Sequence, residues 1–144
     1  MLLVHHLLED RPMPHVLRSD ASVRDASRFL CEKQIGGAPV VDNGRLVGFC
    51  SERDLVFRVI AQSRDPDSTF VRDIMTRDVI TATPDDSILA CEDMLRAAHC
   101  RHLPVVKGSY VVGCLSMREF LRADLRDREQ QVRELTEYIR SAGA

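Results

Sequence analysis

The sequence predicts an α+β protein made of two β-α-β-β-α repeats, packed with pseudo-twofold symmetry into one module, plus a long C-terminal helix. The main observation is a segment that recurs, without a gap, at a period of 65 residues (Val105 minus Val40). Within each copy, apolar spacing switches between the periods of helices and of strands. After the second copy, a helical pattern continues well beyond what the repeat requires.

The repeated unit centres on a Pro-Val-Val segment and a following Gly-x-x-Ser motif. Ala38-Pro39-Val40-Val41 and Gly48 to Asp54 in the first copy correspond to Leu103-Pro104-Val105-Val106 and Gly113 to Glu119 in the second. The identities between the copies are Asp20/Asp85, Ser22/Ser87, Leu30/Leu95, Pro39/Pro104, Val40/Val105, Val41/Val106, Val47/Val112, Gly48/Gly113, Ser51/Ser116 and Arg53/Arg118. A period held over a whole supersecondary unit indicates a tandem repeat.

The totals indicate an ordinary globular protein. The chain has 144 residues, 44% hydrophobic and 29% charged, with 20 basic against 22 acidic side chains. This balance argues against a nucleic-acid-binding surface, which usually shows a basic excess. The opening apolar run, Met1 to Val4, is too short for export or a membrane span. Five cysteines without a C-x-x-C pair predict reduced thiols and a cytoplasmic location.

Turn and capping residues divide the chain into elements. In the first repeat we expect a short helix at 4–10, a short strand at 15–17 and a helix at 23–35. Two strands at 38–41 and 46–50, joined by the turn Asp42-Asn43-Gly44, and a helix at 51–61 follow. In the second, the expected elements are a helical lead-in and their counterparts, at 70–75, 79–82, 88–98, 103–106, 111–115 and from 116 onward. The predicted divisions are repeat 1 with its lead-in helix (1–62), a linker (63–69), repeat 2 (70–127) and a C-terminal helix extension (128–144).

This order of elements, given twice, resembles a pair of cystathionine-β-synthase-type (CBS) domains, the Bateman module. The segment Phe70 to Thr76 is similar to the one that commonly precedes such a domain. The resemblance covers about residues 5–127. It implies two related clefts that bind adenosine-containing ligands, most simply AMP, ADP or ATP, with S-adenosylmethionine or NAD as further options. It also implies regulation of another protein through a change in conformation or oligomeric state.

The resemblance assigns the ligand contacts to the repeated motif. Asp54 and Glu119 become the carboxylates that grip the ribose hydroxyls, with Ser51 and Ser116 as their hydroxyl partners. A charged carboxylate makes strong hydrogen bonds with a vicinal diol. Gly48 and Gly113 remove a side chain where the backbone approaches another group closely. The same Ser-x-x-Asp and Ser-x-x-Glu spacing is also a helix capping box, so a purely structural role stays open.

Differences between the copies predict two unequal clefts. Arg101-His102 in the second repeat replaces Gly36-Gly37 in the first, which places a cation beside the second strand. Lys107 adds a second basic side chain near it. The resemblance also assigns a ligand contact to Thr81, because the strand before each helix reads the adenine edge in this family.

Other chemistries find less support in the sequence. His99-Cys100-Arg101-His102 holds three potential metal ligands, but no second cluster completes a site, so we predict no metal. No catalytic triad pattern, G-x-G-x-x-G or P-loop occurs, which predicts a chain that is not an enzyme, with no catalytic residues and no cofactor. A redox switch that uses Cys50 and Cys114 remains an alternative.

The C-terminal helix is the other informative segment. Leu121, Leu125, Val132, Leu135 and Ile139 recur at spacings typical of one helix face, with Arg128 interrupting them. A Glu129/Arg133 pair would support the helix. The face either packs on the core or contacts a second copy or a partner. We therefore expect a non-enzymatic sensor of adenine nucleotides, acting as a homodimer or on a separate effector. The alternative is an interaction module with vestigial clefts that acts through helix 118–141.

Overall fold

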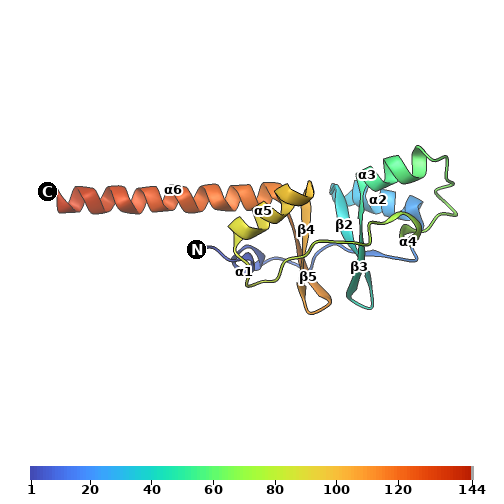
Figure 1. Cartoon of the computed structure of the whole chain (residues 1–144), viewed down its shortest axis with the longest axis horizontal. Coiled ribbons are helices and arrows are strands. Elements are labelled where there is room, and N and C mark those ends of the chain that lie inside the picture. Colours follow the sequence, from blue (N-terminus) through green and yellow to red (C-terminus); the bar gives the residue numbers. More distant parts are fainter. Residues whose placement is uncertain (144) are drawn as a thin grey trace.

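The computed structural model describes residues 1–143 and shows an α+β body from which one long helix projects (Figure 1). Five strands form one sheet in the order β1-β2-β3-β5-β4. The elements in chain order are α1 (Val4–Leu8), β1 (Leu17–Arg18), α2 (Val23–Lys33), β2 (Gly37–Asp42), β3 (Arg45–Ser51), α3 (Glu52–Leu55), the π-helix η1 (Val56–Ile60), α4 (Val71–Ile74), α5 (Ile88–Ala98), β4 (His102–Lys107), β5 (Tyr110–Ser116) and α6 (Met117–Ala142). The predicted fold class is confirmed.

The two repeats have the same strand register. In the first, β2 pairs antiparallel with β3 from Gly37↔Ser51 onward, and in the second β4 pairs with β5 from His102↔Ser116 onward. Both hairpins carry a register shift directly after the valine that faces the motif glycine, Val40 or Val105. The 65-residue period of the sequence is therefore also the period of the backbone hydrogen bonds.

Turn and cap residues act locally as the sequence predicts. Asn43 and Gly44 have positive φ values of 53° and 80°, which fits the tight β2–β3 turn. Ser22 and Ser87 cap α2 and α5, because each side-chain oxygen accepts a hydrogen bond from the backbone N–H three residues on. These two helices then bury their apolar faces against the sheet.

Two expected elements differ from the prediction. Residues 79–82 do not form a strand, and only Ala82 makes a parallel bridge, to Val105. The expected helix over 51–61 is a single α-turn followed by η1, whose wider turn closes with the hydrogen bond from Ala61 N to the Val56 carbonyl. The sheet stays continuous between the repeats through the pairing of Arg45 with Tyr110.

Each repeat has its own core, and each core is completed by a short helix from elsewhere in the chain. α1, at the N-terminus, packs on the second repeat, where Val4 is fully buried and its N–H donates to the Asp86 carbonyl at 2.8 Å. α4, which precedes the second repeat, packs on the first, where Val71 is fully buried and its N–H donates to the Ala21 carbonyl at 2.9 Å. The chain thus crosses between repeats twice. The division into residues 1–62 and 70–127 remains a prediction about sequence units. In the folded chain, α1 and α4 each pack on the repeat that lies on the other side of this division.

The C-terminal helix does not pack on the core along its length. Phe120 is the buried residue of α6, and Ala123 packs beside it against the second core. The five apolar residues of the predicted face are exposed, from 48% at Leu121 to 63% at Val132. Packing against the module is therefore wrong for this face. Residue 144, at the end of the predicted extension, lies outside the described residues.

The side-chain contacts along α6 also differ from the expected pairing. Arg133 donates to Gln130 at 3.0 Å, and no Glu129–Arg133 ion pair forms in the described helix. Arg128 pairs instead with Asp124, one turn before it, at 3.2 Å. Among residues 1–143, no helix has the length and apolar character needed to cross a membrane.

Candidate functional site

A cavity of about 1050 Å³ lies at the junction of the two repeats. Its walls come from the segment after α1, the start of β2, the start of β4 and the junction of β5 with α6. This volume suits a small-molecule ligand. Five of the nine predicted ligand contacts line it, namely Arg101, His102, Gly113, Ser116 and Glu119.

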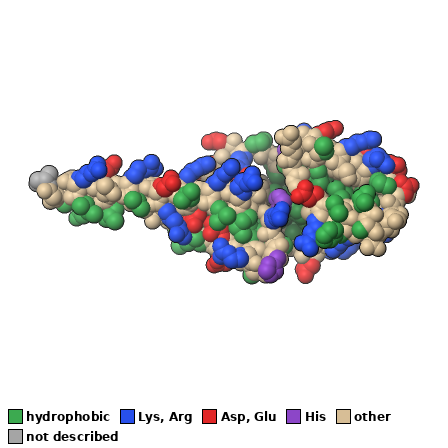
Figure 2. All heavy atoms as spheres, turned by 90° about the horizontal axis from the view of Figure 1, so that it is seen from above, with side chains coloured by type: hydrophobic (Ala, Val, Ile, Leu, Met, Phe, Trp, Pro, Cys, Tyr) green, Lys and Arg blue, Asp and Glu red, His purple; other side chains and the backbone are tan. Residues whose placement is uncertain are grey.

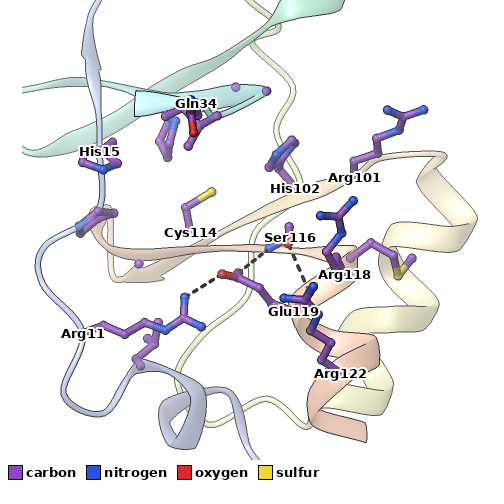
Figure 3. Close-up of a pocket in the computed structure, with 18 of the residues that line it drawn as sticks. Arg11, His15, Gln34, Arg101, His102, Cys114, Ser116, Arg118, Glu119 and Arg122 are labelled. Carbon is purple, nitrogen blue, oxygen red and sulfur yellow. Dashed lines mark hydrogen bonds and ion pairs between the residues drawn. The ribbon is translucent and has the colours of Figure 1, made fainter. Parts of the chain in front are cut away.

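Glu119 is held at the cavity by the first turn of α6 (Figure 3). Its Oε2 accepts from the backbone N–H of Ser116 at 2.9 Å, and its own N–H donates to Ser116 Oγ at 3.2 Å. The second oxygen, Oε1, accepts from Arg11 Nη1 at 3.0 Å. The side chain is 34% exposed. A carboxylate has about four lone-pair sites, so these two bonds leave acceptor capacity directed at the cavity.

Basic side chains outnumber acidic ones around this cavity. Arg11, Arg101, Arg118 and Arg122 line it (Figure 3), and its carboxylates belong to Glu119 and Glu52. The N-terminus of the 26-residue helix α6 also faces it, and the helix dipole adds partial positive charge there. The cavity therefore combines a ribose-type acceptor with an environment that favours an anion.

His102 forms an aromatic wall between the repeats. Its ring stacks on Phe49 from the first repeat, with centroids 5.5 Å apart and planes 28° apart. Burial is the main cause of the lowered pKa of His102, so its imidazole is neutral near pH 7. A neutral ring presents a flat surface to a ligand, and the cations nearby come from arginine. Gly36 lies beside this ring, since a Cβ on it would make an ordinary van der Waals contact with His102 Cε1, at 3.5 Å.

The carboxylate oxygens of Asp54, the corresponding residue of the first repeat, are largely occupied by contacts within the chain. Its Oδ2 accepts from the N–H and Oγ of Ser51 at 2.9 and 3.1 Å. Thr76 Oγ1 lies 3.5 Å and Arg58 Nε 3.7 Å from Oδ1, and the side chain is only 10% exposed. None of Asp54, Ser51 or Gly48 lines the large cavity. Here the capping role predicted for the motif is what the structure shows.

The motif glycines approach the chain's own lead-in segments. A Cβ on Gly48 would lie 2.5 Å from Met75 Sδ and 2.9 Å from the Thr76 carbonyl oxygen. A Cβ on Gly113 would lie 2.6 Å from Leu8 Cδ2. Met75 follows α4 and Leu8 ends α1, so the two glycines have equivalent roles in seating the crossing helices.

The remaining predicted contacts lie elsewhere. Thr81 is half-buried beside the Ala82 bridge and does not line the cavity, which instead takes Pro14 and His15 from the first repeat. Lys107 is exposed at the β4–β5 turn, outside the cavity.

Sequence reasoning missed Arg11, Arg118 and Arg122. Arg118 and Arg122 follow the Ser116 motif at positions that place them on the first turns of α6, so helical spacing from Ser116 could have found them. Arg11 could not be found this way, because its position depends on α1 crossing to the second repeat.

Two further groups bear on metal and redox chemistry. Potential ligand atoms of His5 and His6 on α1 and of Glu9, which follows this helix, lie within 4.8 Å of one another, with His5 half-buried and the other two exposed. His6 Nδ1 already accepts a hydrogen bond from the Leu3 N–H at 2.9 Å, which occupies one ring nitrogen.

Burial raises the pKa of the Cys50 and Cys114 thiols to about 12. Both are protonated near neutral pH and so poorly reactive, which argues against the redox alternative.

The fold and the cavity define a tandem α+β module with a ligand-sized pocket where its two repeats meet. The family model of the CBS domain matches residues 9–61 and 71–126. These matches cover most of the chain and both repeats. The chain belongs to the CBS-domain family.

Curated relatives place the same module in several proteins. The chain is 32% identical over 126 residues to the mitochondrial CBS domain-containing protein CBSX3 of Arabidopsis thaliana, covering 84% of this chain and 61% of that protein. It is 38% identical over 100 residues to inosine-5'-monophosphate dehydrogenase of Nitrosopumilus maritimus, covering 69% of this chain and 20% of the enzyme. The chain thus spans less than two thirds of the length of these relatives.

Solved structures share the whole module. A CBS-domain protein of Burkholderia ambifaria superposes with a TM-score of 0.80 at 29% identity, covering 88% of this chain and 96% of that one. The CBS domain pair of protein MJ0100, solved with 5-methylthioadenosine and S-adenosyl-L-methionine, has a TM-score of 0.77 at 27% identity and covers 88% and 98%. The protein PAE2072 of Pyrobaculum aerophilum, complexed with AMP, has a TM-score of 0.73 at 29% identity and covers 82% and 89%.

Proposed function

We propose that this chain is a non-enzymatic regulatory module that binds an adenosine-containing ligand, AMP or ATP first among them, in the cavity between its repeats. The observation that carries the proposal is the half-buried carboxylate of Glu119 in a cavity of about 1050 Å³ whose other charged walls are mostly arginine. Structural neighbours that carry AMP or S-adenosyl-L-methionine support the ligand class.

The ligand contacts follow from the chemistry of each wall. Glu119 accepts hydrogen bonds from the two ribose hydroxyls, sharing its Oε1 with Arg11 or releasing that arginine. Arg101, Arg118 and Arg122 neutralise a phosphate or, with S-adenosylmethionine, its carboxylate. His102 and the apolar side chains near it offer a flat surface to the base.

The two motifs differ in function under this proposal. Glu119 and Ser116 form the ligand site, with Gly113 seating α1 beside it. Asp54 and Ser51 cap α3, and the ligand roles that the sequence assigns to them, and to Gly48 and Thr81, remain predictions without a cavity to support them.

Calorimetric titration of nucleotide-stripped protein tests the proposal, with AMP, ATP, S-adenosylmethionine and NAD as the ligands. We expect saturable binding of at least one, lost in Glu119→Ala and retained in Asp54→Ala, the matched change in the first repeat. Loss in Asp54→Ala alone would move the site to the first repeat. If the folded protein showed no measurable binding of any of the four ligands, the adenosine site would be refuted.

The regulated activity lies outside this module under this proposal, and the effector acts through a contact that ligand binding changes. The homodimer and the cytoplasmic location expected from the sequence belong to the same proposal. The interaction module acting through α6 is the second candidate. The observation that favours it is the exposed apolar face of that helix.

A further inference from the structure

The projecting part of α6 carries an apolar stripe with nothing of the described chain packed on it. We call Leu121, Leu125, Val132, Leu135 and Ile139 the α6 stripe. Figure 2 shows hydrophobic side chains gathered along one side of the projecting helix and charged ones along the other. Contiguous exposed apolar surface of this kind marks an interaction site.

The spacing of the stripe is that of a two-helix coiled coil. With Arg128 counted in the one gap, its members are separated by four, three, four, three and four residues. This is the heptad pattern whose two core positions pair with a second helix of the same pattern. A second copy of this chain presents the same stripe, of the same length, so the surface is complementary to itself.

Arg128 decides the direction of pairing. In a parallel, in-register pair, each Arg128 would face Arg128 of the other copy across the core, and like charges would be buried together. In an antiparallel pair centred on Gln130, Arg128 lies opposite Val132 of the second copy. Glu129 of that copy is then one helical turn away, within reach of the guanidinium. This register also aligns the whole stripe, with Leu121 opposite Ile139 and Leu125 opposite Leu135.

We propose that the α6 stripe pairs antiparallel with α6 of a second copy, and that this pairing closes the cavity between the repeats. The first members of the stripe, Leu121 and Leu125, also line that cavity, as does Arg122. In the antiparallel register the last turn of the second copy, with Tyr138 and Ile139, lies against Leu121. The second copy therefore contributes side chains to the rim of the ligand site.

This arrangement links assembly to ligand occupancy. If the paired form holds the ligand more tightly, then ligand strengthens pairing by the same factor, because binding free energies are reciprocal. The linkage rests on the proposed function, whereas the pairing itself does not.

Light scattering and sedimentation of the full chain without ligand test the pairing, over concentrations from about 1 to about 200 µM. We expect a dimer that dissociates on dilution, and a monomer for Val132→Glu. Glu137→Arg, a charge reversal on the opposite face of the same helix, should leave the dimer intact. A monomeric wild type at every concentration would overturn the proposal. The proposal would also be overturned if Val132→Glu remained a dimer and Phe57→Glu dissociated it. Phe57 is an exposed side chain of η1 in the first repeat, so the dimer interface would then lie there and not at the α6 stripe.

A charge exchange tests the direction. Arg128→Glu and Glu129→Arg should each weaken the dimer at least about tenfold, because each sets like charges opposite one another. The double variant should recover most of the lost dimer affinity, because a glutamate at position 128 then faces an arginine at position 129 of the second copy. Failure of the double variant to recover the dimer would overturn the antiparallel register, because a parallel pair keeps like charges opposed in every variant.

The linkage to the cavity has its own readout. Ile139→Glu changes no residue that lines the cavity in one copy, and it should weaken AMP binding at least about fivefold, the low end of usual coupling factors. Unchanged AMP affinity in a monomeric Ile139→Glu protein would overturn the linkage while leaving the pairing in place. Absence of nucleotide binding in wild type refutes the proposed function instead, and the sedimentation result still stands.

Discussion

Gly48→Ala and Gly113→Ala form a matched pair that tests how the crossing helices are seated. Neither glycine has a positive φ, so alanine meets no backbone strain at either position. The two changes add the same methyl group at equivalent places in the two repeats. They differ only in what that methyl group meets.

At Gly48 the new Cβ meets backbone as well as a side chain. It would lie 2.9 Å from the Thr76 carbonyl oxygen, which accepts from Phe49 N–H at 2.8 Å, while Thr76 N–H donates to the Phe49 carbonyl at 2.9 Å. Overpacking costs about 1–3 kcal/mol, and loss of one of these bonds adds about 1 kcal/mol. Alanine also restricts the unfolded chain at this position, which returns about 0.4–1 kcal/mol. We therefore expect a net loss of about 2–3 kcal/mol.

At Gly113 the new Cβ meets only the end of the Leu8 side chain, at 2.6 Å. Moving that side chain off its rotamer costs about 1 kcal/mol. The restriction of the unfolded chain by alanine returns about 0.4–1 kcal/mol. The net change in stability should be below about 1 kcal/mol.

Thermal unfolding followed by circular dichroism measures the difference. About 2 kcal/mol between the variants corresponds to a gap of about 8 °C in Tm for a chain of this size. Adding Leu8→Ala should leave the Gly113→Ala protein free of any clash, whereas Met75→Ala should not rescue Gly48→Ala, because the Thr76 carbonyl remains. Equal losses at the two glycines would refute this account of the lead-in segments.

Two further predictions concern buried ionisable groups. Burial, then a nearby aspartate, raises the pKa of Glu92 above 4.5, and its Oε1 has no hydrogen-bond partner. The free energy of unfolding should therefore fall as pH rises from about 4.5 towards the folded-state pKa. Glu92→Gln should be more stable than wild type by about 1 kcal/mol at pH 7, and the two stabilities should become equal in acid. A thiol reagent at pH 7.5 should label the exposed Cys31 and Cys100 well before the buried Cys50 and Cys91, and rapid labelling of all four would contradict this difference in exposure.

The fold could be predicted from the sequence because its signals are local and repeated. The Pro-Val-Val strands, the Asn43-Gly44 turn and the serine caps each depend on residues only a few positions apart. Their repetition at one period fixed both register and pseudo-symmetry. The capping boxes at Ser51 and Ser116 were predicted for the same reason.

The difference between the two carboxylates could not be predicted in this way. Asp54 is enclosed by Thr76 and Arg58, whereas Glu119 meets Arg11 and the cavity. Both outcomes depend on where α1 and α4 pack, a long-range choice that leaves no periodic trace in the sequence. The exposure of the α6 stripe is likewise a tertiary fact, since the same spacing fits a buried face.

The crossing of α1 onto the second repeat has a consequence for the order of synthesis. Val4 and His5 hydrogen-bond to Asp86 and Pro84, which leave the ribosome about eighty residues after them. The Val4 side chain stays exposed to solvent until then, whereas the first repeat needs only α4 to complete its core. At typical elongation rates of about 5–20 residues per second, α1 has no packing partner for about 4 to 16 seconds. During that interval α1 is accessible to chaperones, and the core of the second repeat is complete only once α1 has packed on it.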